Sequence, residues 1–153
     1  MSRLELKIPP DVVWVIVAGL MWTAARATPR LVVPFPLRAG IGTVLTMLGV
    51  AIIIGARKAL ERANTTWGPM SPERTTSLVT AGVYSFSRHP MYLGMLLVML
   101  AWAALLASPT ALIVSGVFVL YIDRFQIAPE ERVLSASLGR EYLDYRTRVR
   151  RWA

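Results

Sequence analysis

The sequence predicts an all-α membrane protein with about four transmembrane helices, including a helical hairpin in its C-terminal half, followed by a cytoplasmic amphipathic helix. Three observations support this fold class. First, the 153 residues are 55% hydrophobic and only 17% charged, whereas soluble domains usually carry about 25% charged residues. Second, the apolar residues gather in uncharged runs that approach the length of a membrane-spanning helix. Third, the cations are distributed unevenly between the segments that separate these runs.

Two uncharged runs lie in the N-terminal third of the chain. Val12–Ala25 contains 14 residues and Ala39–Ala56 contains 18, and a membrane-spanning helix needs roughly 20 apolar residues. The first run alone is short enough to be an interfacial or re-entrant helix. Because extension to Pro9 and Thr28 would let it cross with its charges at the interface, we expect a span.

The third and fourth helices are expected within one uncharged block of 33 residues, Pro90–Ile122. This block is too long for one span and short for two. Ser108 and Pro109 lie near its middle, and the residue before a proline disfavours the helical conformation. We therefore expect a tight hairpin whose two helices cover approximately Met91–Ala107 and Thr110–Ile127.

The whole chain, 1–153, is expected to form a single domain. Its predicted parts are N-terminal helices at 1–57, a polar loop at 58–89, the hairpin at 90–128 and a C-terminal helix at 129–153. The loop assignment rests on residues that break helices, namely Gly68-Pro69, Ser71-Pro72 and Gly82.

The tail is predicted to be one amphipathic helix. Its apolar side chains recur at spacings of three and four residues, which is typical of a helix with one apolar face. Gly139 weakens this pattern without erasing it, and arginines occupy much of the remaining surface. Such a helix is expected to lie along the anionic cytoplasmic leaflet. The apolar stripe comprises Leu134, Leu138, Tyr142, Tyr145, Val149 and Trp152.

The distribution of cations predicts the orientation. The net charge is +8, and 14 of the 17 Lys and Arg residues lie in the N-terminus, the 57–89 segment and the tail. The segment from Arg26 to Arg38 holds the other three. The positive-inside rule then puts both long polar segments in the cytoplasm. The apolar runs make a membrane surface a better partner for this charge than nucleic acid.

The side chains with reactive groups are few. The chain has no cysteine and one histidine, so we expect no metal site and no cysteine nucleophile. His89 stands between Arg88 and Pro90 where the polar loop enters a membrane helix. The first-turn N–H groups and these cations suit a carboxylate or phosphate; the equally weighted alternative is that Arg88 and His89 anchor the helix at the interface.

Acidic residues come at the same end of the predicted hairpin. Asp123 and Arg124 follow Thr110 too closely to have cleared the hydrocarbon, so they are expected to face the bundle interior or to pair with neighbouring charges. Glu130 and Glu131 either favour the start of the tail helix or face the mouth of the hairpin. Because two antiparallel helices return the chain to its starting end, His89 and these acids are expected to lie together.

Several segments, taken together and in order, resemble the integral-membrane methyltransferase superfamily, which contains isoprenylcysteine carboxyl methyltransferases and phospholipid N-methyltransferases. The resemblance runs from Thr76 to the end of the chain, and its pieces are specific as an ordered set rather than singly. They are Leu78–Tyr84, Arg88–Gly94 with its R-H-P-x-Y-x-G pattern, Glu130-Glu131 and Leu138–Tyr142.

The resemblance implies that the cofactor is S-adenosylmethionine, bound at the cytoplasmic end of the hairpin. We expect catalytic roles for Arg124 and Glu131. At Gln126 this chain departs from the isoprenylcysteine enzymes, which place an arginine implicated in substrate handling there; Arg124 is a candidate substitute. The implied cofactor-binding residues are Leu78, Val79, Tyr84, His89, Pro90, Met91, Tyr92 and Glu130.

The expected function is therefore methyl transfer to a lipophilic acceptor in the membrane, with O-methylation of a carboxylate on an isoprenylcysteine-like molecule preferred. A carboxylate is already ionised at neutral pH, whereas an amine would need Glu131 or His89 to remove a proton. The alternatives are N-methylation of a phospholipid ethanolamine, an NADPH-dependent membrane reductase, and a non-enzymatic membrane protein that binds anionic lipid through its arginine-rich tail.

Overall fold

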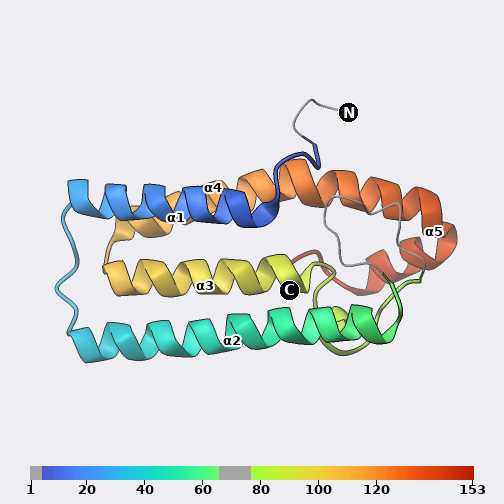
Figure 1. The fold of residues 1–153 in the computed structure, drawn as a ribbon, viewed down its shortest axis with the longest axis horizontal. Coiled ribbons are helices and arrows are strands. Elements are labelled where there is room, and N and C mark those ends of the chain that lie inside the picture. The colour runs from blue at the N-terminus through green and yellow to red at the C-terminus, as the bar shows by residue number, and fades with distance from the viewer. Residues whose placement is uncertain (1–4, 66–76) are drawn as a thin grey trace.

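The computed structural model describes residues 5–65 and 77–153, and every regular element in these ranges is helical (Figure 1). Four α-helices lie side by side with alternating direction, and a fifth continues beyond them. In chain order the elements are α1 (Pro10–Ala27), α2 (Phe35–Arg62), η2 (Gly82–Ser85), α3 (Pro90–Leu106), α4 (Pro109–Ile122), η3 (Asp123–Ile127) and α5 (Ala128–Arg148).

The helices have the length and composition expected of a membrane protein. In the described ranges, three helical stretches are long and apolar enough to cross a membrane: α1, α2 and Pro109–Arg148, which α4, η3 and α5 form together. The shorter apolar helix α3 has 17 residues, or about 26 Å at 1.5 Å per residue. The all-α membrane fold is therefore confirmed, and the run Val12–Ala25 lies in a helix long enough to span.

The centre of the bundle is where α3 packs against its three neighbours. α3 contacts α2, α4 and α1, and α1 also packs along α4. Met21, Met99 and Phe118 are fully buried in this core. In contrast, Val44 and Ile113 are more than half exposed on the outer faces, as expected for side chains that contact lipid.

The predicted hairpin is confirmed, with each helix beginning one residue earlier than expected. Proline occupies the first turn of both α3 and α4, where its fixed φ is favourable and its missing N–H costs nothing. Ala107 adopts a left-handed conformation in the turn, and the Ser108 side chain accepts a hydrogen bond from the backbone N–H of Ala111. These features reverse the chain within two residues.

Two glycines set the distance between α2 and α3. A Cβ on Gly49 would lie 2.6 Å from the carbonyl oxygen of Gly94, and a Cβ on Gly94 would lie 2.6 Å from that of Gly49. Both distances are too short for a real side chain, so only glycine allows these backbones to touch. Because Gly94 is one turn beyond the start of α3, this contact also fixes where that start lies.

Two predicted boundaries were wrong. The second hairpin helix does not end at Ile127, because η3 is a π-helix that carries α4 directly into α5. The polar loop does not begin at residue 58, because α2 continues to Arg62. The breakers Gly68-Pro69 and Ser71-Pro72 lie outside the described residues, and Gly82 begins η2.

The prediction of one amphipathic tail helix was also wrong. Gly139 has φ 55° and ψ −128°, a conformation that side chains with a Cβ rarely adopt, and the chain turns there. Tyr142 and Tyr145 are consequently buried in the protein, and the Tyr145 hydroxyl donates to the carbonyl oxygen of Tyr84 at 2.6 Å. The helix ends at Arg148, Val149 is extended, and the residues after it form no regular element.

Candidate active site

Four segments, from three separate parts of the sequence, meet at one end of the bundle. They are the segment before α3, the first turn of α3, the first turn of α5 and the last residues of the chain, whose end lies beside the start of α3 in Figure 1. Hydrogen bonds to backbone carbonyl oxygens join two of them directly. The Arg88 N–H donates to the Arg150 carbonyl oxygen at 3.0 Å, and the Ser87 hydroxyl donates to that of Arg151 at 3.2 Å.

His89 lies at the centre of this cluster and is 5% exposed. It is the residue before the first turn of α3, and its backbone N–H donates to the Ser87 hydroxyl at 3.2 Å. Its ring lies between two carboxylates. Nδ1 is 3.7 Å from Glu130 Oε2, and Nε2 is 3.4 Å from Glu131 Oε1.

Tyr92 completes a group of three predicted cofactor residues. Its ring stacks on that of His89 with centroids 5.9 Å apart, and its hydroxyl donates to Glu130 Oε2 at 3.4 Å. The structure therefore brings His89, Tyr92 and Glu130 together, as the sequence predicted. Pro90 is buried in the same turn, and Met91 is partly exposed.

The two adjacent acids differ in their environments. Glu131 accepts from Arg151 Nη2 at 2.6 Å and pairs with Arg88 Nη2 at 2.9 Å. Burial alone would raise the pKa of Glu131, but hydrogen bonds with His89 and Arg151 outweigh it and lower the pKa to about 2. Burial raises the pKa of Glu130, and the nearby His89 only partly opposes this. Glu131 is thus a fixed anion, and Glu130 is the acid with capacity for another partner.

Arg151 is the residue that sequence reasoning missed. Besides Glu131 it binds Asp123, with Nη1 3.0 Å from both carboxylate oxygens. Hydrogen bonding to Glu131 is the main cause of a raised pKa for Arg151. Asp123 thus pairs with a neighbouring charge, one of the two roles expected for it. Nothing in the tail sequence distinguishes Arg151 from the arginines beside it.

Arg124 is not part of the cluster. Its side chain is 59% exposed, and Nη1 lies 3.4 Å from Glu5 Oε1. The neighbouring Gln126 is fully buried and donates to the Ile8 carbonyl oxygen at 2.6 Å. Arg124 and Gln126 therefore contact the N-terminal segment rather than the His89 cluster.

The remaining predicted residues lie in the segment before α3. Leu78 and Val79 are half-buried in a stretch without regular secondary structure. Tyr84 is 9% exposed in η2 and is held by Tyr145 of α5 through the hydrogen bond at its carbonyl oxygen. Within the described ranges, no group of three or more histidine or acidic side chains could hold a metal ion.

Comparison with known proteins identifies a family and several relatives that this chain resembles. Residues 37–141 match the phospholipid methyltransferase family. An uncharacterized protein of Haemophilus influenzae is 45% identical over 62 residues, which are 40% of this chain and 98% of that protein. Protein-S-isoprenylcysteine O-methyltransferase of Mus musculus is 37% identical over 75 residues, 49% of this chain and 26% of the relative.

A longer match is found in plants. Protein-S-isoprenylcysteine O-methyltransferase A of Arabidopsis thaliana is 30% identical over 104 residues, 68% of this chain and 53% of the relative. The chain thus spans between about a quarter and a half of the length of the two named methyltransferases. No solved structure matches it significantly.

Proposed function

Because the chain belongs to the phospholipid methyltransferase family, we propose that it is a membrane methyltransferase that uses S-adenosylmethionine to methylate a lipophilic acceptor. The observation that carries this proposal is the cluster of His89, Tyr92 and Glu130, which lies within the matched residues at one end of an apolar bundle. Such a position lets a polar cofactor and an acceptor from the bilayer meet.

The polar groups at the start of α3 suit the methionine portion of the cofactor. The N–H groups of a first helical turn and the ring of His89 suit its carboxylate. The carboxylate of Glu130 suits its ammonium or the ribose hydroxyls. Burial raises the pKa of Glu130. A cation bound beside Glu130 would lower this pKa again and favour the ionised carboxylate.

The apolar groups nearby suit the adenine. Pro90 and Met91 share the first turn with His89, while Leu78, Val79 and Tyr84 come from the segment before it. When bound, the cofactor supplies an electrophilic methyl group on a sulfonium. The protein's own part is to hold the reactants in line and to exclude water, and positioning of this kind can contribute about 7–11 kcal/mol.

We propose a carboxylate on an isoprenylcysteine-like molecule as the acceptor. Two named relatives are isoprenylcysteine O-methyltransferases, and a carboxylate needs no base at neutral pH. Glu131, with a pKa of about 2 and two arginine partners, is a poor proton acceptor. We assign it to the positioning of His89. Arg124 has no part in this proposal because it points to Glu5 instead.

Phospholipid N-methylation is the second candidate. The matched family carries that name, and an acid with a raised pKa, Glu130, is better suited than Glu131 to take a proton from an ammonium. In either case the active end would face the cytoplasm, since 14 of 17 cations lie in the segments at that end. The partners are the bilayer and its lipophilic acceptor.

The test uses the purified protein in lipid nanodiscs with methyl-labelled S-adenosylmethionine. The acceptor is either N-acetyl-S-farnesylcysteine or phosphatidylethanolamine. Mild alkali releases label from a methyl ester as methanol, whereas an N-methyl group survives, so the product identifies the acceptor class.

We expect alkali-labile label, reduced about 10- to 100-fold in His89→Ala and Glu130→Gln, as for loss of a hydrogen bond to a charged group. The exposed Asp144 provides the control, Asp144→Asn, which should retain wild-type activity. Full activity of both cluster variants would overturn the assigned site, and absence of cofactor binding to the wild type would overturn the function.

A further inference from the structure

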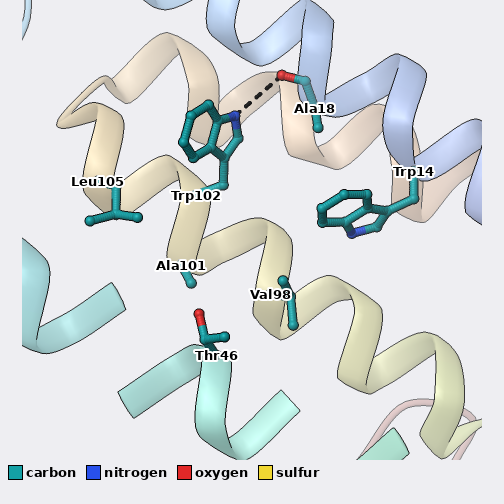
Figure 2. A pocket seen from close by; sticks show the side chains of 7 residues that line it. All are labelled: Trp14, Ala18, Thr46, Val98, Ala101, Trp102 and Leu105. Carbon is teal, nitrogen blue, oxygen red and sulfur yellow. Dashed lines mark hydrogen bonds between the residues drawn. The ribbon is translucent and has the colours of Figure 1, made fainter. Parts of the chain in front are cut away.

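A pocket of about 330 Å³ opens between α1, α2 and α3 (Figure 2), and none of its lining residues belongs to the His89 cluster. Trp14 and Ala18 of α1 line one side, and Thr46 of α2 lines the other. The volume lies within the range of about 300–1,000 Å³ typical of small-molecule sites. Since α1 and α2 each pack against α3 more closely than against one another, α3 forms the floor between them.

The floor of the pocket is one face of α3. It consists of Val98, Ala101, Trp102 and Leu105, whose spacings of three and four residues put them on the same side of the helix. Met91, seven residues before Val98, continues this face into the first turn of α3, where the proposed cofactor residues lie. The helical rise puts Val98 about 10 Å and Leu105 about 21 Å from Met91.

The depth of one leaflet falls between these two distances. The hydrocarbon core of a bilayer is about 30 Å thick, so one leaflet is about 15 Å deep. A lipid whose reactive head lay at the start of α3 would therefore place the middle of its chain beside Val98 and the end of its chain near Trp102, before Leu105. The pocket therefore lies at the depth that the apolar chain of such a lipid would occupy.

The residues that line the pocket suit the apolar chain of a lipid rather than its polar head group. Both indole N–H groups are already used, since Trp14 Nε1 donates to the Met95 carbonyl oxygen at 2.9 Å and Trp102 Nε1 donates to that of Ala18 at 3.3 Å. Figure 2 shows the second of these bonds, with Trp14 and Trp102 on the α1 side of the pocket. The indoles thus offer apolar ring surface, and no charged side chain lines the pocket.

We propose that this pocket binds the apolar chain of the methyl acceptor and thereby selects acceptors with a chain long enough to reach Trp102. This inference rests on the proposed function for the identity of the head group. It adds a binding site about 10–20 Å from the reacting end.

The experiment is photo-cross-linking of the whole protein in nanodiscs, which requires no methyl transfer. The probe is N-acetylcysteine carrying a 15-carbon thioether chain with a terminal diazirine, and adducts are mapped by peptide mass spectrometry. We expect adducts on Trp14, Trp102 or Leu105 that are displaced by N-acetyl-S-farnesylcysteine but not by the excess nanodisc phospholipid. Adducts spread over lipid-facing positions such as Ile113, without displacement, would overturn the proposal by showing only annular lipid.

Two threonines of α2 provide a matched pair of variants. Thr46 lines the pocket, whereas Thr43 is exposed one turn earlier. Thr46→Phe should abolish most of the displaceable adduct and leave cofactor binding unchanged, while Thr43→Phe should change neither. Equal adducts in both variants would contradict the pocket assignment. Displaceable pocket adducts without any methyl transfer would support the chain site while overturning the function.

Discussion

Arg151 joins three parts of the candidate site, although the sequence did not indicate it. Its guanidinium binds Glu131 and Asp123, and its carbonyl oxygen accepts from Ser87, so the tail, the loop and the hairpin meet at one residue. The sequence could not indicate this role because Arg148, Arg150 and Arg151 are chemically identical. Only the turn at Gly139 and the course of the chain after α5 bring one of them back to the cluster.

Arg151→Ala is expected to lower the free energy of unfolding by about 1.5–3 kcal/mol, the usual contribution of a hydrogen bond to a charged group. The reason is that Glu131, 5% exposed, would keep only Arg88 as a cationic partner besides His89. Thermal unfolding in detergent measures this change. Arg150→Ala is the control, since the Arg150 side chain is exposed. Equal effects of the two variants would show that Arg151 acts only through its charge.

The low pKa of Glu131 predicts an acid-dependent stability. The pKa falls from an ordinary value of 4.5 to about 2 in the folded protein, so the ionised form is the one that folding favours. The stabilisation is therefore complete above pH 4.5 and lost as the pH falls from 4.5 towards 2. The groups facing this carboxylate are His89, Arg88 and Arg151.

Melting temperatures of the wild type and Glu131→Gln give the measurement. The wild type should be the more stable at pH 6, and its advantage should shrink at pH 3 because the carboxylate is then closer to its neutral form. A difference that stays constant over this range would contradict the low pKa.

At the scale of helices, local chemistry determined what could be predicted. The hairpin followed from one uncharged block with Ser108-Pro109 at its middle, because both the polarity and the proline signal are local. The π-helix at Asp123–Ile127 has no such local signal. It is accompanied by tertiary contacts, including the hydrogen bond of Gln126 to Ile8 and that of the Leu6 N–H to the Phe125 carbonyl oxygen.

The contact between α2 and α3 gives a prediction about helix packing. Gly94→Ala should destabilise the protein by about 1–3 kcal/mol, the usual cost of overpacking a filled interior, because the new methyl would meet Gly49 and Ile53 at 2.6 Å. Gly116→Ala on α4 is the matched control, since a Cβ there meets nothing within 4 Å. It should be neutral or slightly stabilising. Thermal unfolding in detergent compares the two, and equal melting temperatures would contradict the close packing.

At the scale of the whole molecule, the sequence predicted the grouping of the site but not its contacts. Antiparallel helices necessarily return His89 and Glu130 to one end, so their proximity followed from topology. The exposure of Arg124 did not, because its partner Glu5 lies 119 residues earlier in the chain and no local pattern links them. The Arg124 guanidinium, which the sequence offered as a substrate contact, instead pairs with Glu5 of the N-terminal segment.

The same topology makes the orientation of the protein testable. Val32 lies in the segment joining α1 to α2, fully exposed, and Thr147 is exposed near the end of α5 at the opposite end of the bundle. The chain has no cysteine, so Val32→Cys and Thr147→Cys each introduce a single thiol. Because the cations gather at the Thr147 end, the positive-inside rule predicts that this end is cytoplasmic.

A membrane-impermeant maleimide applied to intact cells should therefore label Val32→Cys and leave Thr147→Cys unlabelled until the cells are lysed. The unsubstituted protein, which offers no thiol, gives the background. Labelling of Thr147→Cys alone from outside would reverse the orientation and place the His89 cluster on the far side of the membrane. Labelling of both from outside would mean that the two positions lie on one side, which is incompatible with helices that cross the bilayer between them.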